Sequence, residues 1–199
     1  MTAPLARVAM LAAATAGCAS LPKAPPAEIA AQARAAQTYS AAMSVRLRGD
    51  GVRARTRALV AWQRPDRLRL EIPGPGGARF VAVTRDGRLA AVFPGERAAF
   101  EGAASAATFE DFLGVALAPA DLMDALVGVA PTRARSFEAR WGARLPARVE
   151  LTLAAGARLK LELEDAETGI PLGEDVFAPP ARAGFRDVDA AEARRLFSR

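Results

Sequence analysis

Residues 67–72 read Arg-Leu-Arg-Leu-Glu-Ile, and this alternation of charged and apolar residues decides the fold. A period of two places every second side chain on the same face of a β-strand. The same alternation recurs at residues 148–153 and 158–164. Strands of this kind predict a sheet with one apolar face and one face in water.

Tight turns separate these strands from further alternating segments. Asp50-Gly51 and Asp86-Gly87 are dipeptides typical of two-residue hairpins, and residues 73–77 form a turn rich in glycine and proline. Because consecutive strands are joined by such short turns, we expect an antiparallel meander. The segments predicted as further strands are residues 44–48, 53–62, 80–84, 89–93 and 97–101.

Four segments have helical spacing instead. Residues 28–40 are rich in alanine, and a second helix is predicted to begin behind Thr108 as its N-cap. A third is predicted from Pro119, and a short C-terminal helix is predicted behind a capping box that starts at Asp189. Gly128 is a suitable end for the third helix.

These elements together predict a mainly β (α+β) fold. The short helices have to cover the apolar face of the sheet, because that face cannot remain in water. We therefore expect a curved antiparallel sheet that forms an open half-barrel covered by short helices.

The composition limits the chemistry available to the chain. It has 199 residues, no histidine and a single cysteine, Cys18, which excludes an internal disulfide, the usual zinc sites and most catalytic triads. Two pairs of acids, Glu110 with Asp111 and Asp121 with Asp124, have no catalytic motif around them. We expect a protein that is not an enzyme and needs no cofactor or metal.

Arginine accounts for nearly all of the positive charge, and the formal net charge is +5. A row of arginines could face phospholipid or lipopolysaccharide headgroups. The simpler interpretation is a solvated sheet face, partly matched by glutamates on other strands. No nucleic-acid motif accompanies the arginines, so we expect no nucleic-acid partner. The arginines of this row are Arg46, Arg48, Arg53, Arg55, Arg57, Arg67 and Arg69, and the glutamates are Glu71, Glu150, Glu162 and Glu164.

The N-terminus has the features of a signal peptide. One arginine in residues 1–7 precedes a short apolar run at residues 8–14, which is too short to span a bilayer. Ala16-Gly17-Cys18 then resembles the bacterial lipobox, although Thr15 stands where leucine is usual. The alternative is an ordinary signal peptide with an incidental cysteine.

The lipobox resemblance implies a lipoprotein with three parts. Residues 1–17 are the signal peptide, residues 18–27 hold the lipidated Cys18 and a proline-rich tether, and residues 28–199 form the domain. The residue after the cysteine is Ala19 and not aspartate. In organisms that sort by this position, that implies a lipid anchor on the periplasmic face of the outer membrane.

The order of parts resembles the LolA/LolB superfamily of lipoprotein localisation factors, most closely over residues 67–131. The resemblance implies an open β-barrel with a helical lid, an apolar cavity for acyl chains or lipoproteins, and a part in lipoprotein transport to the outer membrane. One departure matters. The receptor's turn exposes an apolar side chain, whereas the matching turn here has Gly76.

Nine apolar residues are the candidates for contact with such a ligand. An ordinary filled core would use the same residue types. Two other functions stay open: a structural or assembly lipoprotein that docks a protein partner of an envelope complex, and a small hydrolase. The nine candidates are Trp62, Leu68, Leu70, Ile72, Phe80, Phe112, Leu122, Leu126 and Leu151.

We predict that Cys18 is acylated, because it is the only thiol and it follows a short apolar run and two small residues. Labelled palmitate should enter the wild-type protein and not the Cys18→Ser variant. Equal labelling of the two proteins would contradict the prediction.

Overall fold

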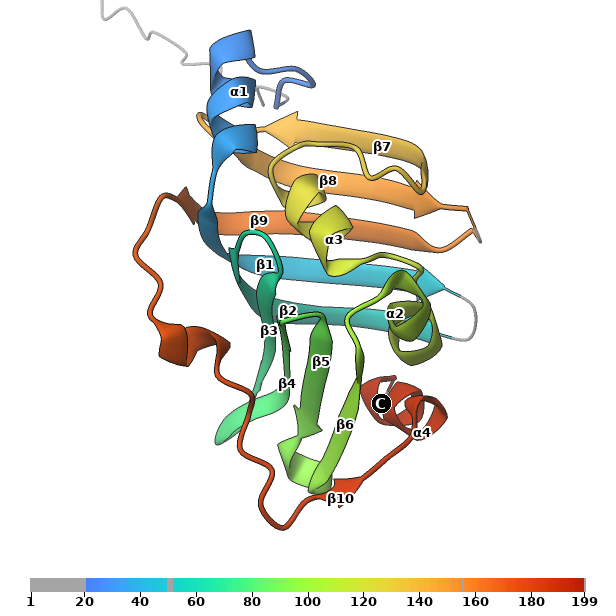
Figure 1. Ribbon diagram of the computed structural model, residues 1–199. Coiled ribbons are helices and arrows are strands. Elements are labelled where there is room, and N and C mark those ends of the chain that lie inside the picture. The colour runs from blue at the N-terminus through green and yellow to red at the C-terminus, as the bar shows by residue number, and fades with distance from the viewer. Residues whose placement is uncertain (1–20, 50–51, 155, 199) are drawn as a thin grey trace, which may run out of the picture.

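The computed structural model describes residues 21–49, 52–154 and 156–198 (Figure 1). Cys18 and the Asp50-Gly51 dipeptide lie outside the described residues. The described strands are β1 (Thr38–Gly49), β2 (Val52–Gln63), β3 (Arg67–Gly74), β4 (Gly77–Arg85), β5 (Arg88–Phe93), β6 (Ala98–Ala103), β7 (Ala134–Trp141), β8 (Pro146–Leu153), β9 (Arg158–Thr168) and β10 (Arg186–Asp187). The helices are α1 (Ala27–Ala35), α2 (Ala106–Leu113), α3 (Pro119–Leu126) and α4 (Ala190–Phe197), with short 3-10 turns η1 (Pro94–Glu96) and η2 (Glu174–Phe177).

All ten strands belong to one sheet in the order β10-β6-β5-β4-β3-β2-β1-β9-β8-β7. Neighbouring strands are antiparallel, except for the short parallel pair of β10 and β6. The edge strands β7 and β10 are not joined, so the sheet stays open. The predicted fold class, a curved sheet with short helices over one face, is confirmed.

The sheet divides between β2 and β3. β2 pairs with β1 over its whole length, from Val52 to Gln63. β3 pairs with β2 only at Leu59–Gln63, and its later residues pair with β4 alone. The two halves of the sheet therefore diverge, and Figure 1 shows β3 to β6 running across the direction of β1 and β2.

One face of the sheet, the inner face, is covered by α2, α3 and α4. In β1, β2 and β8 the alternation sets this face, since most residues of one parity are buried and those of the other are mostly half-buried or exposed. On α2, Phe112 packs against Phe80 of β4 and Phe100 of β6, with ring centroids 5.8 and 5.3 Å apart. Phe197 of α4 joins the same aromatic cluster.

Two predicted helix boundaries were wrong. The helix predicted over residues 28–40 ends at Ala35, because Tyr39 is drawn into β1, where its ring stacks on Trp62 at 5.4 Å. The N-cap of α2 is Ser105 and not Thr108. The Ser105 hydroxyl accepts a hydrogen bond from the Thr108 amide, so the helix begins one turn earlier.

The other helix signals agree with the structure. Pro119 occupies the first turn of α3, and Gly128 follows its end with φ +79°. Asp189 caps α4 by accepting a hydrogen bond from the Glu192 amide. β7 is absent from the predicted strands; its pairing with β8 has two irregularities, after Ala134 and after Arg140, that disturb the alternation.

The glycine turns lead to a matched test of packing. Gly128 and Gly76 share φ +79°, a conformation that costs an alanine about 1–2 kcal/mol. A Cβ at Gly128 would also overlap the indole of Trp141, whereas a Cβ at Gly76 would meet nothing within 4 Å. Gly128→Ala should therefore lower the free energy of unfolding by about 1–3 kcal/mol more than Gly76→Ala in chemical denaturation. Equal losses would show that Trp141 moves aside freely.

Candidate functional site

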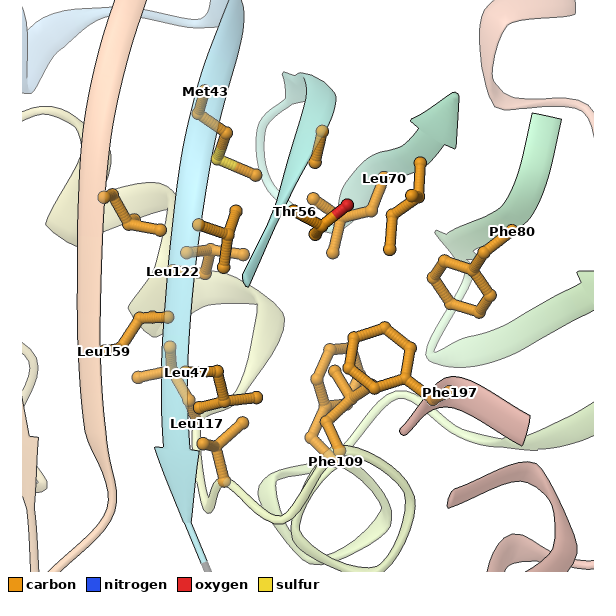
Figure 2. A pocket seen from close by; sticks show the side chains of 16 residues that line it. Met43, Leu47, Thr56, Leu70, Phe80, Phe109, Leu117, Leu122, Leu159 and Phe197 are labelled. Carbon is orange, nitrogen blue, oxygen red and sulfur yellow. The ribbon is translucent and has the colours of Figure 1, made fainter. Parts of the chain in front are cut away.

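A cavity lies between the inner face of the sheet and the helices. The volume open to the centre of a water-sized sphere is about 80 Å³, and the empty space between the side chains, including the part open to solvent, is about 670 Å³. Figure 2 shows the side chains that converge on the cavity. The lining residues are Met43, Val45, Leu47, Thr56, Ala58, Leu70, Ile72, Phe80, Phe109, Leu113, Val115, Leu117, Leu122, Leu159, Leu161 and Phe197.

The floor of the cavity comes from adjacent strands in register. Val45 of β1 lies opposite Leu161 of β9, and Leu47 lies opposite Leu159. On β2 the inner face carries the small residues Thr56 and Ala58 at this level. The space exists because these small side chains stand beside large ones.

The roof is formed by α2, α3 and the segment between them. Phe109 and Leu113 are one turn apart on α2, so both point at the sheet. Gly114 then adopts φ +72° and turns the chain back, with its amide donating to the Glu110 carbonyl. Leu117 and Leu122 complete the roof.

The mouth of the cavity is marked by lining residues that are only half-buried: Val45, Thr56, Leu70 and Phe197. Leu70 comes from β3 near the point where β3 leaves β2, and Thr56 comes from the part of β2 that β3 does not pair. Phe197 of α4 lies edge-on to Phe80 at 5.4 Å. The division of the sheet and the C-terminal helix together bound the opening.

The opposite end of the inner face is filled. Tyr39 and Trp62 are fully buried and stacked, and the Arg64 guanidinium lies 5.2 Å from the Trp62 ring centroid. Arg64 also donates to Asp124 of α3 at 2.7 Å and so connects β2 to the helix cover. Burial raises the pKa of the Tyr39 hydroxyl, so this end carries a neutral phenol.

Electrostatically the cavity is featureless. Of the described residues that line it, Thr56 alone carries a polar side chain, and its hydroxyl donates to the Arg57 carbonyl. Within residues 21–49, 52–154 and 156–198 there is no group of three or more acidic, histidine or cysteine residues that could hold a metal. In the same ranges no helix combines the length and the apolar character needed to cross a bilayer. An arrangement of this kind can bury hydrocarbon.

Four of the nine predicted contact residues line the cavity: Leu70, Ile72, Phe80 and Leu122. The other five are buried in the core and do not line it. Trp62 and Leu68 face each other across β2 and β3 toward the filled end, and Phe112 is at the centre of the aromatic cluster. Leu126 of α3 and Leu151 of β8 also belong to the core.

Most residues of the floor and the mouth are not among the nine predicted contacts. Met43, Leu159 and Leu161 have the same alternation that identified Leu70, so their inner-face position could have been found. Phe197 had only a place in a short amphipathic helix as its signal. Nothing local to the sequence indicates that α4 returns to the mouth.

The fold and the cavity define a class of protein: a helix-covered half-barrel with an apolar interior. Solved structures of similar fold include a LolA superfamily protein of Nitrosomonas europaea, with a TM-score of 0.44 and 11% identity over 76% of this chain and 94% of that chain. A DUF1329 family protein of Desulfovibrio piger has a TM-score of 0.42 and 10% identity over 80% of this chain and 97% of that chain.

A third similar structure is an outer membrane lipoprotein-sorting protein domain of Vibrio parahaemolyticus, with a TM-score of 0.39 and 11% identity over 76% of this chain and 95% of that chain. No protein-family model and no curated protein sequence matches this chain.

The position of the mouth can be tested with single cysteines in a Cys18→Ser background. Val45 and Leu161 are cross-strand partners that both line the cavity, but Val45 is half-buried and Leu161 is 1% exposed. We expect Val45→Cys to react with a maleimide at least tenfold faster than Leu161→Cys, because reaction requires solvent access. Equal rates would place the opening elsewhere.

Proposed function

We propose that this chain is a lipid-binding lipoprotein of the bacterial envelope, anchored through Cys18, whose half-barrel shelters the acyl chains of a lipid or of a lipoprotein. The observation that carries the proposal is the cavity, which is lined by apolar side chains and opens at one end. Its work is binding and transfer within the envelope, in the manner of a lipoprotein-sorting factor on the periplasmic face of the outer membrane.

Binding in such a cavity is driven by removing hydrocarbon from water. Each methylene buried contributes about 0.8 kcal/mol, so six contribute on the order of 5 kcal/mol before the entropy cost of ordering the chain. The headgroup of the lipid remains at the mouth, between Thr56 and Phe197, since the interior offers it no hydrogen-bond donor. The cavity therefore selects acyl chains by their length and shape.

The acids considered at the sequence level have other tasks in this proposal. The Asp121 carboxylate accepts a hydrogen bond from the Ala118 amide at the start of α3, and Asp124 pairs with Arg64. Glu110 and Asp111 are exposed on α2. None of the four lines the cavity, so the proposal includes no catalytic step.

The proposal predicts that filling the cavity weakens acyl binding. Ala58→Leu adds three carbons to an inner-face residue of β2 that lines the cavity. The affinity for a fluorescent fatty acid should fall at least tenfold, while the midpoint of thermal unfolding should stay the same or rise, as it does when a void is filled.

Ala61→Leu is the matched control, because Ala61 is three residues further along the same strand, on the opposite face. The Ala61→Leu variant should bind the fluorescent fatty acid with the affinity of the wild type. If both variants bind as the wild type does, the ligand is not in this cavity. If the wild type binds no fatty acid, docking of a protein partner becomes the better explanation of the half-barrel.

A further inference from the structure

Arginines gather on the outer face of the sheet at the end where the β1–β2 hairpin turns. We call this group the arginine patch. Its members are exposed and come from three adjacent strands, β1, β2 and β9. The arginine patch consists of Arg46, Arg48, Arg53, Arg55 and Arg158.

The strand register places these like charges directly opposite one another. Arg46 lies opposite Arg55, and Arg48 lies opposite both Arg53 on one side and Arg158 on the other. Directly opposed residues have Cβ atoms about 4.5–5.5 Å apart, and like charges at that distance destabilise a sheet. The fold therefore tolerates repulsion between these arginines, although a glutamate at one of the positions would relieve it.

Three arginines on the neighbouring parts of β2 and β3 do have such partners. Arg57 pairs with Glu164, Arg69 with Glu71 and Arg67 with Glu174. Within the described part of the chain, no carboxylate oxygen lies within 4.0 Å of a patch guanidinium. Asp50 lies outside that part, and residues 46–57 hold five arginines against this one acid.

Two neighbours of the patch limit what it can meet. Lys160, opposite Arg46, is 2.9 Å from Glu150 and adds little further charge. Leu59 lies on the same outer face of β2 as Arg53, Arg55 and Arg57, and its side chain is 46% exposed. Leu59 stands opposite Glu71, four residues beyond Arg55, and offers an apolar contact on the face that carries the cations.

We infer that the arginine patch docks the domain on an anionic phospholipid bilayer. The phosphates of the lipid supply the charge that the protein leaves unmatched, and Leu59 contacts the apolar boundary below them. A single-stranded nucleic acid fits less well, since the patch has no aromatic side chain on which a base could stack.

Docking of this kind does not depend on acyl binding, because the patch lies on the outer face and the cavity on the inner face. Both use the same stretch of β1 and β2: Val45 and Thr56 at the mouth alternate with Arg46 and Arg55. When the patch is docked, only the thickness of the sheet separates the mouth of the cavity from the lipid. The β3–β4 turn cannot make such a membrane contact at Gly76, because glycine has no side chain.

Vesicle binding tests the inference. The full chain carrying Cys18→Ser, with and without Arg48→Gln, Arg53→Gln and Arg55→Gln, is mixed with vesicles of phosphatidylcholine alone or with about 30% phosphatidylglycerol. Each arginine near an anionic surface changes partitioning about fivefold, so the triple variant should bind the anionic vesicles about a hundredfold more weakly. Its midpoint of thermal unfolding should rise, because the repulsion within the patch is relieved.

The control removes the same charge elsewhere, through Arg34→Gln, Arg79→Gln and Arg88→Gln on exposed positions of α1, β4 and β5. It should keep its affinity within about threefold, since screening confines these forces to about 10 Å. If both triple variants lose the same affinity for anionic vesicles, the effect comes from net charge alone, and the inference is overturned. Tight binding of duplex DNA without binding of anionic vesicles would overturn it in favour of a nucleic-acid surface.

Discussion

The structure depends on how far β3 follows β2. The two strands share hydrogen-bonded register only at Leu59–Gln63, next to the stacked rings of Tyr39 and Trp62. Those rings fill the inner face at the joined end and fix it. Beyond them the two halves of the sheet separate, and the side chains that project inward no longer meet across the interior. The cavity forms at the end where β2 and β3 separate, because the stacked rings of Tyr39 and Trp62 hold the sheet together at the other end.

The helices complete this geometry. α3 is tied to β2 through Asp124 and Arg64, at the filled end. α2 and α4 are joined to β4 and to each other by the aromatic cluster around Phe112, at the open end. The cover is therefore attached by a partly exposed ion pair at the filled end and by aromatic packing at the open end.

The sequence predicted which face of a strand each side chain occupies. It could not predict whether an inward side chain lies at the mouth of the cavity or at the filled end. Alternation assigned Leu70 and Trp62 to the same face, and both do point inward. Only the long-range register shows that Leu70 is at the mouth while Trp62 is at the filled end. Local propensity also failed where tertiary packing was stronger, as at Tyr39, which the stack with Trp62 takes out of the predicted helix.

The free part of β2 has a consequence for the behaviour of the protein at high concentration. From Val52 to Ala58 this strand has a strand neighbour on one side only among the described pairs. Such an edge is a template on which a second molecule can add a strand, and the usual protection is charge along the edge. Arg53, Arg55 and Arg57 supply that protection, and two approaching edges of this kind repel each other. The arginines that crowd the hairpin thereby keep an open sheet from growing by edge-to-edge association.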